Sequence, residues 1–346
     1  MSNMFARVCT EPVNPCLGIR RFLCGSSSSL RAACLHKRSA LRVSGEDAGK
    51  FLQGLVTQDV LGSVHPVSAV QYAHILNAKG RTKYDIMIYP ELQSTGASTT
   101  DYLVEADRLI LADLHNMLKL YRMRAKVDFS STDGDWKIWV VQGDVSSSIS
   151  VPAGGRFGPD PRLSGFHRLA LPGDEVPPGE IGVHDSVADE YLLARWRHGA
   201  CEGVEELEPG EALPLEHNLD LNNGVCFKKG CYVGQELTAR THFTGVVRKR
   251  ALPVRLLSGS GGDFSPGLAL ASRVRADGES ENSGRGPGQL KRAGKLRAWF
   301  GERGIAVVPV ELARTPSSTV LCAKSDANES TLAIGELSPA LEKAAG

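Results

Sequence analysis

The stretch AVQYAHILNAKGRTKYDIMIYPE, residues 69–91, indicates the fold more clearly than any other part of the chain. Two runs with β-branched and aromatic residues flank Asn77–Gly80, a sequence typical of a hairpin turn. The second run alternates, with Tyr84, Ile86 and Ile88 on one side of the expected strand. These residues therefore predict an antiparallel hairpin with one apolar face.

The segments around this hairpin alternate between helical and extended patterns. A helix is predicted to start near Ser44, a second is capped by Asp107, and a third ends at Gly199. Short strands are predicted at 101–106, 125–130, 136–142 and 166–171, with loops at 143–165 and 172–180. This order predicts an α+β fold with largely antiparallel strands.

The C-terminal part, residues 251–340, consists of short β-rich runs separated by turn signals, which predict a small all-β module. Residues 258–292 interrupt these runs with a segment rich in Gly, Ser and Arg. Such a segment buries too little apolar surface to offset the entropy lost on ordering. A disordered insertion is therefore expected, most clearly at 272–292.

The chain has 346 residues, a net charge of +1 and 42% hydrophobic residues, enough for a sizeable core in one or two domains. The near-neutral charge gives no indication of nucleic-acid binding, and no apolar run is long enough for a membrane span. Residues 1–40 differ, with six basic residues, one acidic residue and a serine-rich tract. This composition predicts a disordered mitochondrial transit peptide, with the ordered chain starting near Leu41.

Eight cysteines are present, and four of them lie in this predicted leader. The remaining four, too few for a disulfide framework, favour a reducing compartment. They are Cys201, Cys226, Cys231 and Cys322. The sequence contains neither a C-x-x-C pair nor an H-E-x-x-H motif, so a self-contained zinc site is not expected.

Cys231 stands in the short basic motif KKGCYVGQE, residues 228–236. The lysines before it favour a thiolate, and the flanking glycines leave room for a partner to approach. An ordinary buried cysteine in a turn is the alternative. Cys226 lies five residues earlier, but the pair lacks the further ligands of a ferredoxin cluster. His217 and His242 are candidate bases if the thiol acts as a nucleophile.

The motif KGCYVGQE resembles the signature of the YgfZ-type folate-binding family, which is related to the aminomethyltransferase (T-protein) of the glycine cleavage system. This resemblance covers roughly residues 40–256, with a weaker match in the C-terminal part. Four further segments carry the resemblance: GEDAGKFLQGLVTQDV (45–60), LNAKGRTKYDIMIY (76–89), LPLEHNLD (213–220) and LTARTHFTGVVRKR (237–250). With its basic leader, the chain is most similar to the mitochondrial iron–sulfur cluster assembly branch of the family.

The resemblance implies a ring of three subdomains around a central cavity. Two subdomains would occupy residues 41–250, and the third, residues 251–340, would be the small β-barrel. Tetrahydrofolate is the ligand expected in the cavity, close to the cysteine loop. The implied ligand-binding residues are Asp85, Glu216, Lys229, Gly230, Gly234, Gln235, Glu236 and Arg240. The sequence has a single aspartate, Asp85, where T-proteins usually carry two, which argues against aminomethyl transfer.

The resemblance also implies a function in the mitochondrial matrix, late in [4Fe–4S] cluster maturation and linked to heme biosynthesis. Cys231 would be one ligand of a transient [2Fe–2S] cluster shared with an A-type carrier protein, the chain being a monomer alone and a heterodimer with the carrier. A positive neighbourhood would suit this anionic cluster, formed by Lys228, Lys229, Arg240, Arg248, Lys249 and Arg250.

Two other hypotheses fit the motif. One is a tetrahydrofolate-dependent one-carbon or sulfur transferase that uses Cys231 as its nucleophile. The other is a scaffold in which this cysteine is structural.

Overall fold

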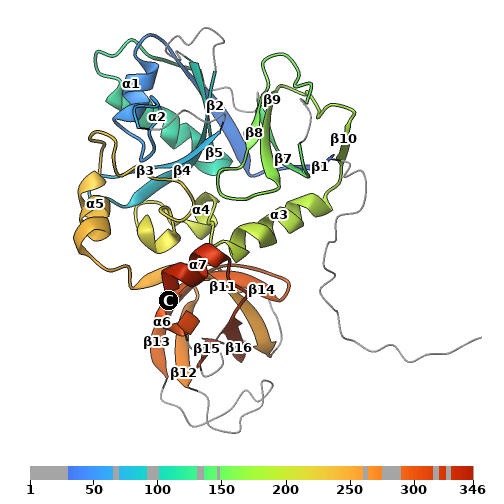
Figure 1. Ribbon diagram of the computed structural model, residues 1–346, viewed down its shortest axis with the longest axis vertical. Coiled ribbons are helices and arrows are strands. Elements are labelled where there is room, and N and C mark those ends of the chain that lie inside the picture. The colour runs from blue at the N-terminus through green and yellow to red at the C-terminus, as the bar shows by residue number, and fades with distance from the viewer. Residues whose placement is uncertain are drawn as a thin grey trace, which may run out of the picture.

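The computed structural model describes residues 30–64, 70–91, 101–130, 136–145, 149–259, 264–274, 290–314, 319–324 and 329–345. These residues form three lobes, two built on five-stranded sheets and one on a closed barrel (Figure 1). Helices and mostly antiparallel strands are mixed in the first two lobes, which confirms the predicted α+β class.

The first sheet is antiparallel throughout and carries two helices, α1 (Ala48–Gln53) and α2 (Leu111–Tyr121), on one face. Its strands, in sheet order, are β3 (Gln71–Leu76), β4 (Thr82–Pro90), β5 (Asp101–Asp107), β2 (Arg38–Ser44) and β6 (Asp128–Ser130). The predicted cap at Asp107 is confirmed, since its side chain accepts a hydrogen bond from the Leu109 N–H in the short 3₁₀ turn (Arg108–Ile110) before α2.

The predicted hairpin is confirmed within the described residues 70–91, with Gln71 paired to Ile88 and His74 to Asp85. Only one face of β4 was expected to be apolar, and this was wrong. Ile86 packs in the core beneath α1 and α2, whereas Met87 packs in a second core against the neighbouring sheet. The strand is therefore buried on both sides, because the second lobe covers the face that a two-layer arrangement would leave to water.

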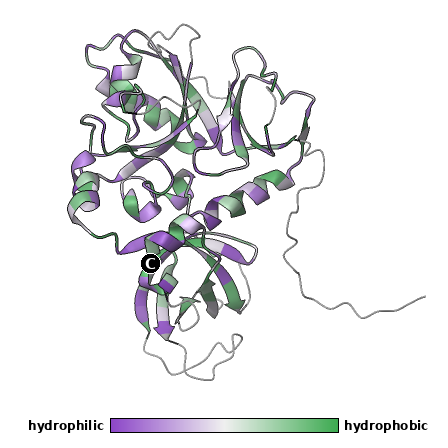
Figure 2. Ribbon diagram, in the orientation of Figure 1, coloured by the Kyte–Doolittle hydropathy of each residue, from purple (hydrophilic) through white to green (hydrophobic). Residues whose placement is uncertain are grey.

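The second sheet lies beside the first and packs against helix α3 (Ser186–Arg197). Figure 2 shows hydrophobic and hydrophilic segments alternating along α3. The sheet's strands, in order, are β10 (Ile181–Val183), β1 (Leu30–Cys34), β7 (Trp136–Gln142), β9 (Phe166–Pro172) and β8 (Arg156–Pro159). Strand β8 lies within 143–165, which was expected to be a loop throughout. The expectation failed because Gly158 and Pro159 within this short strand are turn residues by composition.

Regular structure is already present at Leu30, so the expected start near Leu41 was wrong. Strand β1 sits inside the second sheet, between β10 and β7, and Ala32 and Ala33 are fully buried. Composition alone extends the predicted leader too far, because small and basic residues also occur within strand β1 and just after it. Any removal of a transit peptide must therefore take place before Leu30 if the sheet is to remain intact.

The third lobe confirms the predicted β-barrel. It is closed by six strands in the order β11 (Lys249–Ser258), β14 (Arg303–Pro309), β13 (Lys291–Phe300), β12 (Ala269–Val274), β15 (Thr319–Lys324) and β16 (Glu329–Ile334). Two short helices, α6 (Glu311–Arg314) and α7 (Pro339–Ala345), lie beside it. The predicted insertion falls mainly on 275–289, outside the described residues, but its two ends are strands β12 and β13.

The segment between α3 and the barrel crosses the middle of the molecule (Figure 1). It contains α4 (Gly203–Glu206), a 3₁₀ turn (Leu215–His217) and helix α5 (Gln235–Thr244), which starts at the last two residues of the cysteine motif. Among the described helices, none is long and apolar enough to cross a membrane.

Candidate functional site

The cysteine motif forms a loop that is fastened to α1 by Lys229. The Lys229 ammonium donates hydrogen bonds to the backbone oxygens of Gln53, Val56 and Gln58, at 2.8, 2.8 and 2.7 Å. These oxygens lie at and just beyond the C-terminal end of α1, where a cation is favoured. Burial lowers the pKa of Lys229 to about 8, against the opposing charge of Asp59. Lys229 was expected to favour the thiolate or bind a ligand, but all three of its donors anchor the loop.

The other end of the loop packs on the turn of the β3–β4 hairpin. Gly234 has a φ of +78°, a conformation that L side chains rarely adopt, and starts helix α5. A Cβ at this position would lie 2.3 Å from the Asn77 carbonyl oxygen and 3.3 Å from the Gly80 Cα. Gly80 is also closely packed, since its own Cβ would meet the Leu237 side chain at 2.8 Å. Two of the segments that carried the family resemblance are therefore in direct contact.

Cys231 itself is exposed, as the accessible-thiol interpretation predicted. Cys226 is buried, and its N–H donates to the Thr57 oxygen at 3.0 Å. Between the two anchors, the Val233 N–H donates to the Gly54 oxygen at 3.1 Å, and its side chain packs against the core beneath α1. The loop thus holds one thiol in solvent on a fixed base and the other beneath the surface.

Replacing Lys229 by methionine is expected to lower the free energy of unfolding by about 2–3 kcal/mol, because three partly buried carbonyl oxygens lose their charged donor. Lys228→Met is the matched control, since Lys228 is exposed and a change there should stay within about 0.5 kcal/mol. Urea denaturation of the two variants measures the difference. Equal stability of both variants would contradict the anchoring role.

The other ligand-binding candidates in the motif have local contacts. Gln235 accepts a hydrogen bond from the Tyr232 N–H at 3.2 Å and so closes the turn before α5. Glu236 and Arg240 are exposed and lie 3.9 Å apart on α5. Gly230 borders open space, since a Cβ added there would have nothing within 4 Å. These residues shape or border the loop, and the geometry alone assigns them no ligand.

The positive neighbourhood is smaller than expected. Arg250 is buried and donates to both carboxylate oxygens of Asp220, at 3.0 and 2.9 Å. Lys229 is also withdrawn from the surface by its carbonyl partners. The exposed cations that remain around the loop and α5 are Lys228, Arg240, Arg248 and Lys249.

Neither candidate base is arranged as a partner of the thiol. His217 is buried, its Nδ1 bonds the Leu213 oxygen at 2.9 Å, and burial lowers its pKa to about 4. His242 is exposed on α5, with its ring stacked on Phe227 at a centroid distance of 3.6 Å. The contacts of these two rings therefore give no support to a nucleophilic Cys231 activated by either histidine.

Asp85 lies in a buried ion network that joins the first two lobes. Arg38 Nη1 donates to one oxygen of Asp85 at 2.8 Å, and the Gly203 N–H donates to the other at 3.2 Å. In the described part of the chain, the network comprises four guanidinium groups and five carboxylates. They belong to Arg38, Arg162, Arg168, Arg195, Asp85, Glu105, Asp160, Glu202 and Glu206.

The network is held together by close charge pairing. Burial acts to raise the pKa of Asp160, but Arg162 and Arg168 outweigh it and lower the pKa to about 2. The same two arginines hold the pKa of Glu202 well below its usual range. The sequence did not reveal most of this network, although Arg168 is the only Arg, Lys, Asp or Glu in the largely apolar strand FHRLALP.

These residues do not fit a folate held by Asp85 and Glu216 together. Asp85 is 2% exposed, and a ligand would have to displace Arg38 from it. A cavity of about 470 Å³ adjoins the network. Its lining includes Arg38 and Glu202 but neither Asp85 nor Glu216. Glu216 has different surroundings: it lines a separate recess of about 260 Å³ beside α5, where burial raises its pKa.

The three-lobed fold resembles that of a solved enzyme. The glycine cleavage system aminomethyltransferase T from Bartonella henselae superposes with a TM-score of 0.62 at 13% identity, covering 91% of this chain and 86% of that one. The fold and site together define a protein of the T-protein fold that carries a fixed, exposed thiol. This confirms the predicted fold class.

Sequence comparison gives the family. The chain is 37% identical over 302 residues to the iron–sulfur cluster assembly factor IBA57 of Mus musculus, covering 82% of this chain and 78% of the relative. It is 36% identical to the Homo sapiens protein over the same shares. No family model matches the chain. The chain therefore belongs to the IBA57 family of mitochondrial iron–sulfur cluster assembly factors, and the predicted mitochondrial location is confirmed.

Proposed function

We propose that this protein acts in the mitochondrial matrix as an iron–sulfur cluster assembly factor in which Cys231 is one ligand of a [2Fe–2S] cluster shared with an A-type carrier. The observation that carries the proposal is the exposed Cys231 thiol on a loop fixed at both ends. The names of the IBA57 relatives support a function in iron–sulfur cluster assembly.

The chemistry of the loop favours a shared cluster over a resident one. A [2Fe–2S] cluster takes four protein ligands, usually thiolates. Within the described residues no group of three or more His, Cys, Asp or Glu side chains is placed to hold a metal ion. Cys226 is buried beneath the loop, so Cys231 is the one of these two thiols that a second protein can reach. The carrier would then supply the other ligands.

The rigid base of the loop suits a transient bridge. Anchoring at Lys229 and Gly234 orders the thiol before the carrier arrives, so less conformational entropy is lost on binding. A cluster held between two proteins can also leave with either one. We place the step late in [4Fe–4S] maturation, where two [2Fe–2S] units are fused with electrons from a donor outside the pair.

Replacing Cys231 by serine is expected to abolish the shared cluster. The purified protein is mixed with [2Fe–2S]-loaded carrier, and absorbance and native mass are recorded. The wild type should give a heterodimer with one cluster, whereas Cys231→Ser should give none while keeping its fold. Cys226→Ala is the matched control and should retain the cluster. Unchanged cluster uptake by Cys231→Ser would refute the proposal.

A further inference from the structure

Three aromatic rings meet on the surface beside the thiol loop. We call Phe227, His242 and Phe243 the aromatic cluster. The Phe227 and His242 rings are stacked, with centroids 3.6 Å apart and planes 8° from parallel. The Phe243 ring meets both edge-on, at centroid distances of 6.1 and 4.9 Å. Such mutual contacts hold the rings in one arrangement without any support from a core.

This cluster leaves apolar surface in contact with water. Phe243 is 68% exposed, and Val246, just beyond the helix, is 77% exposed. Helix α5, whose ten residues are all described, buries only Thr238. None of the three rings packs in a hydrophobic core of the described residues. An exposed apolar patch on a helix that buries so little indicates a surface that another protein covers.

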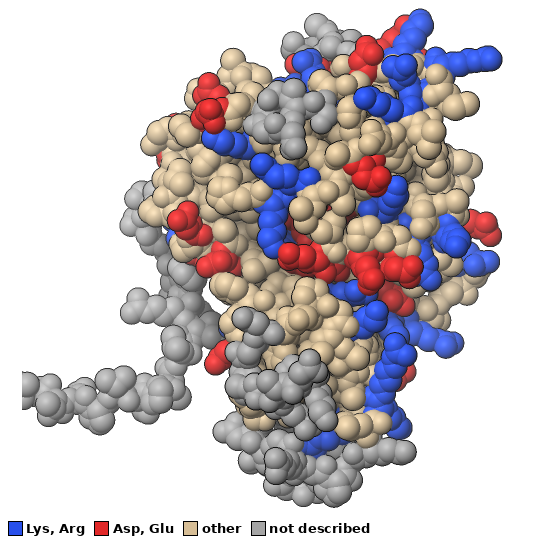
Figure 3. Space-filling view, turned by 180° about the vertical axis from the view of Figure 1, so that it is seen from behind, with Lys and Arg blue, Asp and Glu red and all other residues tan. Residues whose placement is uncertain are grey.

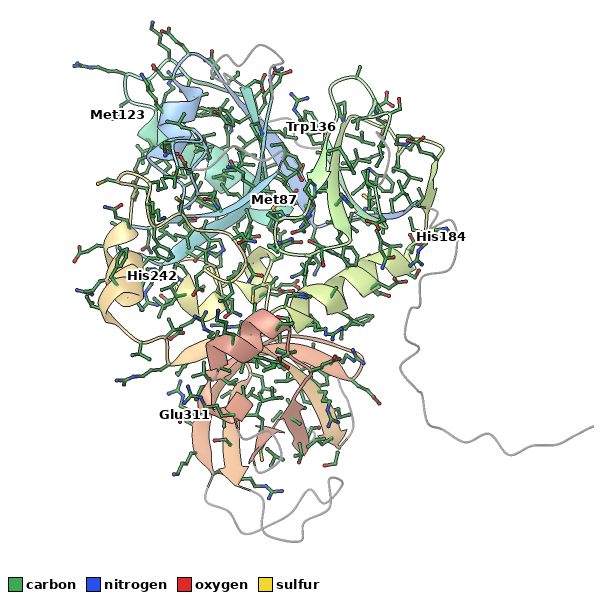
Figure 4. The ribbon with its side chains drawn as sticks, in the orientation of Figure 1. Met87, Met123, Trp136, His184, His242 and Glu311 are labelled. Atoms are coloured by element: carbon green, nitrogen blue, oxygen red, sulfur yellow. The ribbon has the colours of Figure 1, made fainter. Side chains whose placement is uncertain are left out.

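The patch and the thiol belong to one structural unit. Phe227 lies four residues before Cys231, and α5 begins four residues after it. The segment between them is fastened to α1 by Lys229 and to the hairpin by Gly234. Figure 4 shows His242 on α5 at the edge of the molecule, well apart from His184 on the opposite side. A partner that reaches Cys231 therefore meets this patch.

A recess adjoins the patch and offers a place for one anchoring side chain. It has a volume of about 260 Å³ and is lined mainly by apolar residues, including Leu213, Leu237 and Val246. Four residues with polar side chains interrupt this lining: Glu216, Thr238, Thr241 and Arg248. Thr238 Oγ1 is buried and has no hydrogen-bond partner in the described part of the chain, and the half-buried Glu216 carboxyl lies on the same recess. An apolar side chain would fill such a pocket.

The rim of this surface is basic. Lys228 is the first residue of the loop, Arg240 lies on α5, and Arg248 and Lys249 follow this helix, all of them exposed. Seen from behind, basic side chains are numerous along the edge that α5 occupies, with a few acidic ones among them (Figure 3). Glu236 is the acidic residue of α5 itself. A partner with acidic residues around an apolar anchor is complementary to this rim.

We infer that the aromatic cluster, with Val246 and the adjoining recess, is the surface on which the carrier docks before its cluster reaches Cys231. The inference rests on the proposed function and adds where the carrier binds and by what chemistry. The carrier presents an apolar side chain bordered by carboxylates. Docking through this patch does not require the cluster, because the rings and the recess contact protein and not metal.

The test measures the Kd of the carrier by isothermal titration calorimetry, with the carrier free of cluster and loaded with [2Fe–2S]. Phe243→Ala and Val246→Ser are each expected to weaken binding of both forms about tenfold, as truncation of a buried interface anchor does. Val176→Ala is the control, since Val176 is 61% exposed on the loop between β9 and β10. It should leave both Kd values unchanged, and urea denaturation should show all three variants as stable as the wild type.

Cys231→Ser separates this inference from the proposed function. It is expected to weaken binding of the loaded carrier only, leaving the cluster-free carrier bound as tightly as by the wild type. If Cys231→Ser loses the cluster while Phe243→Ala and Val246→Ser bind normally, the docking surface is wrong and the proposed function stands. If both patch variants weaken the cluster-free carrier while Cys231→Ser keeps the cluster, the surface stands and the shared-ligand function is wrong. A wild type that dimerises through the patch, with Phe243→Ala monomeric, would overturn the choice of partner.

Discussion

Replacing Arg168 by methionine is expected to lower the free energy of unfolding by about 3–5 kcal/mol. Arg168 is fully buried in strand β9 and contacts three acids. It donates to Glu105 at 3.1 Å, to Asp160 at 3.4 Å and to Glu202, and to the Tyr191 hydroxyl at 2.5 Å. Methionine fills similar space but leaves the acids without this cation.

The size of the effect follows from the charge count of the buried ion network. Among the described residues, four guanidinium groups face five carboxylates in the wild type, so removing Arg168 leaves three against five. Two uncompensated negative charges then remain in a region that excludes water, where ionisation is strongly disfavoured. Removing one charged partner from a buried ion network lowers the stability by far more than the intact network raises it relative to an apolar core.

Urea denaturation at pH 7 measures this loss, with Lys37→Met as the control. Lys37 pairs with Glu205 at 2.8 Å, but both side chains are more than half exposed, so the control should lose at most about 1 kcal/mol.

A pH series adds a second readout. The unpaired carboxyls of Arg168→Met acquire raised pKa values in the folded state, so their penalty exists at high pH and is relieved as they are protonated. The stability gap to the wild type should therefore shrink as the pH falls. A small stability difference between Arg168→Met and the wild type at pH 7 would contradict this role of Arg168.

The hairpin, the barrel and the capped helix at Asp107 were predictable because their signals are local. A turn at Asn77–Gly80 and alternating strands require only neighbouring residues, and the structure confirms them. The ion network was not predictable in the same way. Arg168 and Glu105 are 63 residues apart, and only the packing of one sheet against the other brings them together. Strand β1 was missed for a similar reason, because its place between β10 and β7 is set by distant partners.

The candidate site shows the same division. The sequence identified the motif and the exposed Cys231, but it assigned Lys229 to the chemistry of the thiol. The ammonium of Lys229 instead binds carbonyl oxygens at the end of α1, more than 170 residues away along the chain. The aromatic cluster escaped notice because Phe227 and His242 are 15 positions apart and become neighbours only when the loop closes. The motif shows which side-chain chemistry is present, whereas the role of each side chain depends on long-range contacts.

Replacing Gly234 by alanine is expected to cost about 3 kcal/mol or more and to detach the thiol loop from its base. Alanine at a φ of +78° is strained, and its Cβ would lie 2.3 Å from the Asn77 carbonyl oxygen, which belongs to a hairpin backbone that cannot move aside cheaply. Gly230→Ala, on the other side of Cys231, is the matched control: its Cβ would meet nothing within 4 Å, so it should stay within about 0.5 kcal/mol. Urea denaturation gives both stabilities, and hydrogen exchange at the Val233 N–H, bonded to the Gly54 oxygen, reports whether the loop has opened. Slow exchange and normal stability in Gly234→Ala would mean that the hairpin does not hold the loop. The thiol on which the shared cluster depends would then not be fixed by this contact.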